Sequence, residues 1–208
     1  GVQQERTISE AFEQSSSGKT LVNMKELDLI VGSGGVLSHA PRRNQSFLMM
    51  IDSFKPEGIT QIAVDSIFMM PQLGVLSTVH DEAALEVFDK DCLIRLGTCI
   101  NPIFSRKINN TDLFNYSFMY KEKEYKGTIK SNEVELFTIP YEKIEITLEP
   151  KGYIDLGNGL GEKVTKDIFG GEVGIMLDGR LKDSLGNIDI ADKNMLVDWY
   201  NKIKVYNL

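Results

Sequence analysis

The sequence predicts a mixed fold, in which an α/β segment is followed by a β-rich domain that ends in a helix. Short apolar runs alternate with helix-like patterns up to about residue 90, and strand-like segments separated by turn residues dominate after it. A helical pattern returns only in the tail. We therefore predict an α/β segment over residues 1–90 and a β-rich domain over residues 91–208 closed by a C-terminal helix.

The first half carries alternating helix and strand signals. The stretch "RTISEAFEQSS" predicts a helix with Ile8, Ala11 and Phe12 on one face, and "LDLIV" predicts a short buried strand. Pro41 suits the first turn of a helix. The apolar face of that helix is expected to contain four residues, Phe47, Leu48, Ile51 and Phe54.

Two further elements complete the predicted α/β segment. The run "ITQIAVDSIFMM", residues 59–70, predicts a second strand because it is rich in β-branched and apolar residues. Asp81 is a predicted N-cap for a helix whose apolar face is formed by Ala84, Leu85 and Phe88.

The second half carries period-two patterns, which indicate strands with one buried face. The segment "KIEITLE" alternates at Ile144, Ile146 and Leu148, and "NYSFMY" alternates in the same way. "YKEKEYK" is expected to form a solvated hairpin tip. In the tail, "ADKNMLVDWYNKI" predicts a helix with one apolar stripe, made of Met195, Leu196, Trp199 and Ile203.

Composition excludes several classes of function. The net charge of −7 gives no basic excess for binding nucleic acid or an anionic membrane. No run approaches the ~18 apolar residues of a membrane span, and the start lacks the apolar core of a signal peptide. Cys92 and Cys99 have neither disulfide-framework nor metal-site spacing, so we expect reduced thiols and a cytoplasmic location.

The glycine turn "VGSGG" between a predicted strand and a predicted helix is the main candidate site. Glycine permits positive φ angles and close approach of a ligand to the backbone, and amide groups converge at such a turn. The spacing of Gly32, Gly34 and Gly35 matches neither the dinucleotide fingerprint nor the P-loop. From the residues alone, a nucleotide-binding turn and a plain connection both stay open.

Charged residues near this turn have two interpretations each. Arg42 and Arg43 open the predicted helix, where they either contact a phosphate or adenine ring or face solvent. Asp65 interrupts an apolar run, so it is either paired inside the structure or directed into a cleft. His39 and His80 are the only histidines, and no metal site is expected around them.

Several long segments together resemble the MutL/GlmL family of accessory proteins for adenosylcobalamin-dependent glutamate mutase. The segments are "LDLIVGSGGVLSHAPRRNQ", "GITQIAVDSIFMMPQLGVLS", "DCLIRLGT" and, near the end, "GGEVGIMLDGR". The resemblance implies membership of the actin/Hsp70/sugar-kinase-like ATPases. It also implies that Gly32, Ser33, Gly34 and Gly35, with Arg42 and Arg43, form the adenosine side of an ATP site, and that residues 1–90 are part of an actin-like lobe.

The resemblance also implies a function, a partner and cofactors. The parent protein is expected to be an ATP-dependent reactivating chaperone that uses ATP and Mg²⁺ and serves glutamate mutase or a related enzyme such as ornithine aminomutase. Two alternatives stay open, a small-molecule kinase of the same superfamily and a non-catalytic interaction module. No catalytic residue and no metal ligand are assigned.

The order of the glycine segments implies that this chain is the C-terminal portion of a longer protein. The segment "YIDLGNGLGE" resembles a phosphate-binding turn, but it follows the adenosine-type turn, which reverses the superfamily order. We therefore interpret it as a glycine-rich loop. With the phosphate turns elsewhere in the parent, this portion alone is expected to bind MgATP weakly or not at all and to be inactive.

Overall fold

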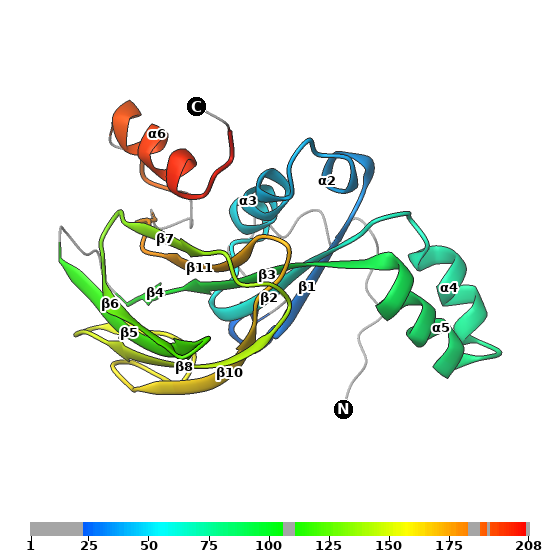
Figure 1. The fold of residues 1–208 in the computed structure, drawn as a ribbon, viewed down its shortest axis with the longest axis horizontal. Coiled ribbons are helices and arrows are strands. Elements are labelled where there is room, and N and C mark those ends of the chain that lie inside the picture. Colours follow the sequence, from blue (N-terminus) through cyan, green and yellow to red (C-terminus); the bar gives the residue numbers. More distant parts are fainter. Residues whose placement is uncertain (1–22, 106–110, 183–187, 191, 207–208) are drawn as a thin grey trace.

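The protein has three layers: helices, a five-stranded sheet and a four-stranded sheet (Figure 1). The computed structural model describes residues 23–105, 111–182, 188–190 and 192–206. The predicted helix at Ile8, Ala11 and Phe12 lies outside these residues. Among the described residues, no helix is long and apolar enough to cross a membrane.

The central layer is a mixed sheet in the order β1-β2-β3-β11-β7. Strand β1 is parallel to β2, β3 is parallel to β11, and the β2–β3 and β11–β7 pairs are antiparallel. Its strands are β1 (Leu29–Ser33), β2 (Gly58–Asp65), β3 (Leu93–Asn101), β7 (Val134–Phe137) and β11 (Gly174–Asp178).

The second sheet is antiparallel in the order β10-β8-β5-β6 and covers one face of the central sheet. The predicted alternation is confirmed, because Ile144, Ile146 and Leu148 of β8 are all buried. The β5–β6 tip is a two-residue turn at Lys121 and Glu122, and both residues have positive φ angles. The strands are β5 (Asp112–Tyr120), β6 (Lys123–Lys130), β8 (Lys143–Pro150) and β10 (Val164–Phe169), and a separate pair is formed by β4 (Ile103–Phe104) and β9 (Ile154–Asp155).

Helices α3 (Arg43–Phe54) and α6 (Lys193–Lys202) cover the other face of the central sheet. In α3, Phe47, Leu48 and Ile51 are buried as expected, but Phe54 is 47% exposed and the prediction for it is wrong. Helix α6 begins at the N-cap Asp192 and buries Trp199, which confirms the C-terminal helix. The short elements η2 (Met24–Glu26) and α2 (Gly35–Ser38) complete this part.

A helical hairpin interrupts the sheet between β2 and β3. It consists of α4 (Met70–Ser77), α5 (Asp81–Val87) and the π-helix η3 (Phe88–Cys92). The predicted strand over residues 59–70 is wrong beyond Asp65, where β2 ends. His80 takes the N-cap position expected for Asp81, which is the first residue of α5. Leu85, expected on an apolar face, is 61% exposed.

Two hydrophobic clusters lie on opposite faces of the central sheet. Ile100 and Ile175 pack with the second sheet, whereas Cys99 and Met176 pack with α3 and α6. This opposition follows from the period-two geometry of strands. The structure confirms a mixed α/β fold with many strands and a C-terminal helix.

The change of composition near residue 90 falls inside the central sheet. Strands β1 and β2 precede this point, and β3, β7 and β11 follow it. The pairing of β2 with β3 joins the two predicted domains along eight register positions from Gly58↔Asn101 to Asp65↔Leu93. The division into independently folding domains stays a prediction, and this shared sheet is the main observation against it.

Candidate functional site

The glycine turn lies between β1 and α2. Gly34 has φ 134 and ψ 147, a conformation that residues with a side chain rarely adopt. A Cβ atom built on Gly34 meets no heavy atom within 4 Å, so this side of the backbone is open. Gly32 has different surroundings, because a Cβ there would displace the flexible side chains of Met50 in α3 and of Leu37. The turn therefore combines one glycine packed under side chains with one needed for its conformation.

The chain after the turn is held by short-range hydrogen bonds. Ser38 Oγ donates to the Gly34 carbonyl at 3.0 Å and lies 3.2 Å from Nδ1 of His39. The His39 amide donates to the Gly35 carbonyl and closes α2. Ser38 and His39 thus have a local capping role at the end of α2.

Asp65 stands at the end of β2, in register with Ser33 at the end of β1. Its buried carboxylate accepts hydrogen bonds from the backbone amides of Ile67, Met69 and Met70 at 3.2–3.3 Å. Of the two interpretations of this residue, the structure favours internal pairing. Asp65 fixes the bend that leads from β2 into α4, next to the glycine turn.

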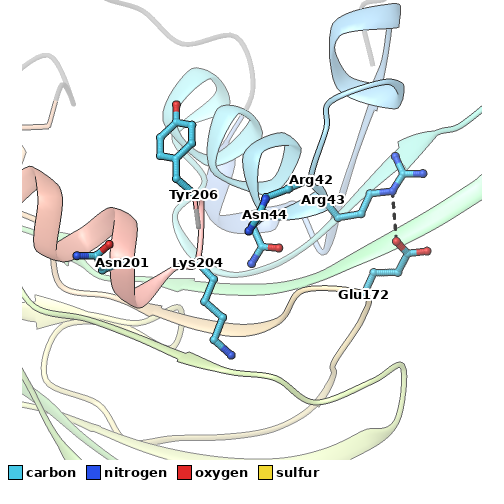
Figure 2. A pocket seen from close by; sticks show the side chains of 7 residues that line it. All are labelled: Arg42, Arg43, Asn44, Glu172, Asn201, Lys204 and Tyr206. Atoms are coloured by element: carbon cyan, nitrogen blue, oxygen red, sulfur yellow. Dashed lines mark ion pairs between the residues drawn. The ribbon is translucent and has the colours of Figure 1, made fainter. Parts of the chain in front are cut away.

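Arg42 and Arg43 line an open pocket of about 950 Å³ between the N-terminus of α3 and the segment after α6 (Figure 2). Among the described residues, the Arg42 guanidinium has no ion-pair or hydrogen-bond partner. Arg43 donates from Nη1 to the Ser38 carbonyl at 2.9 Å, and its Nε lies 3.2 Å from the Glu172 carboxylate. Arg42 is therefore the guanidinium that is available to an anionic group.

The opposite wall of the pocket comes from the C-terminal segment. Lys204 adds a third cation, and Tyr206, which is 52% exposed, adds an aromatic ring. Asn44 ties the two walls together, because its Nδ2 donates to the Ile203 carbonyl at 2.7 Å. With three cations and the single carboxylate of Glu172, the lining suits an anionic ligand.

The structure separates the six predicted site residues into two places. Arg42 and Arg43 line the pocket, whereas the turn residues Gly32, Ser33, Gly34 and Gly35 are not among its lining residues. Arg43 links the two places through its bond to Ser38 at the end of α2. Their joint role in one nucleotide site stays a prediction.

The loop "IDLGNGLGE" closes on its own carboxylate. Asp155 accepts hydrogen bonds from the amides of Gly157 and Gly159 at 2.8 and 3.0 Å and from Nζ of Lys25 at 2.6 Å. Burial raises the pKa of Asp155, but these hydrogen bonds outweigh it and hold the pKa below its ordinary value. Two amides that a phosphate would need are thus already engaged, which agrees with a structural loop.

Sequence reasoning missed a buried charge cluster at the end of β11. Asp178 is fully buried and receives two hydrogen bonds of 2.8 Å from the guanidinium of Arg180, which also contacts Asp52 of α3 at 2.9 Å. Lys182 donates to the buried Asn101 at 2.6 Å. The signal was present as three charged residues, Asp178, Arg180 and Lys182, directly after the apolar run "GIML". In the described part of the chain, no group of three or more His, Cys, Asp or Glu side chains is placed to hold a metal ion.

Comparison with known proteins found one similarity, which lies in the N-terminal part of the chain. No curated protein and no solved structure matches the chain. Residues 2–92 match the family model described as MutL protein, which covers less than half of the 208 residues and includes β1, the glycine turn, α3, β2 and the helical hairpin. Residues 2–92 of this chain are therefore similar to the MutL family.

Proposed function

We propose that this chain is the C-terminal portion of an ATP-dependent accessory protein that reactivates an adenosylcobalamin-dependent mutase such as glutamate mutase. The observation that carries the proposal is the MutL family match over residues 2–92, which contains the open glycine turn after β1. The family match is the basis for proposing a mutase as the partner, and the turn provides a surface on which a nucleotide can lie.

In this proposal the exposed backbone at Gly34 lies along the adenosine, and Arg42 offers its free guanidinium to the ligand. Gly34 has the φ of 134 and the empty surroundings that close contact with a flat ligand needs. Arg42 is suited to this role because guanidinium groups stack on aromatic rings and bind phosphate oxygens. The finer assignment to an actin-like ATPase lobe belongs to the same proposal.

The phosphate-holding turns and the Mg²⁺ ligands belong to the remainder of the parent protein in this proposal. The engaged amides at Asp155 support that view, since the glycine-rich loop over residues 154–162 is already closed by its own carboxylate. Contact with adenosine alone leaves stacking and a few hydrogen bonds, so we expect MgATP to bind this chain no tighter than about millimolar. ATP turnover would drive a change between two lobes that loosens the mutase and releases damaged cobalamin.

The test measures ATP hydrolysis by the full-length parent with inactivated glutamate mutase. We expect the mutase to stimulate hydrolysis, and Gly34→Val to weaken nucleotide binding, because a β-branched residue disfavours the required φ and covers the open backbone. Gly152→Val is the matched control, since Gly152 also has a positive φ and open surroundings but lies outside the turn.

Two results would contradict the proposal. Unchanged nucleotide affinity in a folded Gly34→Val variant would make the turn a plain connection. Phosphoryl transfer to a small acceptor, without any effect of the mutase, would support the kinase alternative instead.

A further inference from the structure

The helical hairpin formed by residues 70–92 projects from the layered body of the protein (Figure 1). The main contacts of α4 and α5 are with each other and with η3, and η3 connects them to β3. A connection between two neighbouring antiparallel strands needs only a few residues. The hairpin therefore adds surface that the central sheet does not require.

The hairpin has a very small core of its own. Its buried residues are Leu73, Ala84 and Cys92, with a few partly buried side chains around them. Helices α4 and α5 have only 8 and 7 residues, and helices this short depend on tertiary packing rather than on intrinsic propensity. Packing against another surface would supply the burial that the hairpin lacks.

Large apolar side chains are exposed on this hairpin. Val75, Val79 and Leu85 are 71%, 72% and 61% exposed. Ile67 and Phe68, which lead into α4, are exposed as well. Single exposed apolar residues are ordinary, but a concentration of them on one projecting element is typical of an interaction surface.

The same hairpin has a strongly negative net charge for its length. Five carboxylates and one lysine give residues 70–92 a net charge of −4, compared with −7 for the whole chain. Glu86 pairs with Lys90, and Asp89 pairs with Arg95. The other carboxylates, Asp81, Glu82 and Asp91, have no cationic partner among the described residues. Charge complementarity therefore requires lysine or arginine on the surface that covers the hairpin.

We propose that the hairpin α4–α5 is the docking surface for a protein partner whose contact surface combines apolar side chains with a basic rim. This inference rests on the proposed function, which identifies the partner as the mutase. A second copy of this chain is the less suitable occupant, since two acidic hairpins repel each other.

The test measures binding of purified glutamate mutase to the 208-residue chain by biolayer interferometry. We expect the double variant Val75→Gln/Leu85→Gln to weaken binding by at least about tenfold, as removal of central apolar contacts does at other interfaces. The double variant Met119→Gln/Leu160→Gln, which replaces exposed apolar residues on the second sheet and on the loop after β9, is the matched control and should leave the affinity unchanged.

A second pair of variants tests the charge. Glu82→Gln should weaken binding and reduce its sensitivity to salt, whereas Glu162→Gln, an exposed carboxylate on the loop after β9, should change neither. Circular dichroism and thermal unfolding are the controls that test whether each variant keeps the fold.

The outcomes separate this inference from the proposed function. If the wild-type chain binds the mutase and the hairpin variants bind it equally well, the assignment of the hairpin as the docking surface is wrong, while the proposed mutase partner stands. If the wild-type chain does not bind the mutase, both are overturned. If ultracentrifugation shows a dimer that the Val75→Gln/Leu85→Gln variant loses, a second copy covers the hairpin and the inference is also overturned.

Discussion

At the scale of single residues, two glycines that look equivalent in the sequence have different structural surroundings, and a substitution would have a different effect at each. A side chain on Gly32 would displace the flexible side chain of Met50, whereas Gly34 is required because its φ is 134. A sequence pattern records only that a glycine is present. This is why the residues alone left the nucleotide-binding turn and the plain connection as open alternatives, and why only the residue with open surroundings, Gly34, is a sharp mutational probe.

The first prediction concerns Asp155 and pH. Its pKa in the folded protein is lowered from 3.8, mainly by Lys25 and two backbone amides acting against the effect of burial. The ionised carboxylate therefore stabilises the fold above the ordinary pKa, and this stabilisation is lost as the pH falls through the lowered value. We expect Asp155→Asn to reduce the free energy of unfolding by about 1–2 kcal/mol near neutral pH and by progressively less in acid.

Urea unfolding of both proteins across acidic and neutral pH measures this difference. Asp28→Asn is the control, because the Asp28–Lys166 pair is exposed and such pairs contribute little. A difference between wild type and Asp155→Asn that does not change with pH would show that the ionised carboxylate is not what closes the loop.

At the scale of secondary-structure elements, the buried charge cluster fixes the end of β11 against two helices. Arg180 bonds to Asp178, contacts Asp52 of α3, and lies with its guanidinium carbon 5.8 Å from the ring centre of Trp199 in α6. Burial raises the pKa of Asp178, but Arg180 overcomes that effect and keeps the pKa below its ordinary value. Arg180 is therefore the main reason that the carboxylate stays ionised in the interior, and Lys182 adds to its effect.

The second prediction follows from that dependence. Arg180→Ala should reduce the free energy of unfolding by about 3–5 kcal/mol, because it leaves a buried carboxylate without its partner. The double variant Asp178→Leu/Arg180→Met should recover much of this loss, since it removes the unpaired charge as well. Lys202→Ala, which removes an exposed ion pair within α6, is the control and should have little effect. A loss below 1 kcal/mol for Arg180→Ala would contradict this account of the cluster.

Elements with a clear periodicity were predictable, and elements without one were not. Strand β8 was predicted because Ile144 and Ile146 have the period-two spacing of one strand face. Helix α6 was predicted because Trp199 belongs to an apolar stripe with helical spacing. All three side chains are buried. Helix α4 was missed because "SIFMMPQLGVLS" is apolar in almost every position, so neither period stands out. Leu85 was predicted on the wrong surface because its helix packs on a very small core.

The pocket shows the same limit at longer range. Arg42 and Arg43 were singled out from local sequence, but Lys204 and Tyr206 on the opposite wall were not. The hydrogen bond between Asn44 and Ile203 joins residues 159 positions apart. Local patterns contain no information about which distant segment will form the second wall of a site, so only the first wall could be predicted.

At the scale of the whole molecule, the two halves share packing as well as a sheet. The face of the central sheet that contains Leu96, Cys99 and Met176 lies in the same hydrophobic cluster as Phe47 and Met50 of α3. The ion pair between Lys25 and Asp155 adds a contact between the N-terminal element η2 and the end of β9. From these contacts we predict that the β-rich half needs residues that precede it in order to fold stably.

The last prediction tests that dependence by expressing residues 91–208 alone. Without β2, the fragment exposes the edge of β3, and unpaired edges of this kind promote aggregation. It also loses the cover of α3 over the sheet face that contains Leu96, Cys99 and Met176. At roughly 1.5–3 kcal/mol per buried side chain, this loss is on the order of 10 kcal/mol, which is comparable with the whole stability of a typical domain, about 5–15 kcal/mol.

We therefore expect the fragment to aggregate or to unfold without a cooperative transition, as measured by size-exclusion chromatography and thermal circular dichroism. A chain trimmed to residues 23–206 is the control and should unfold cooperatively, because it keeps both cores and all strands of the central sheet. A fragment 91–208 that is monomeric and melts cooperatively near the temperature of the intact chain would establish the two-domain division predicted from composition. It would also mean that the β2–β3 pairing joins two units that are already folded.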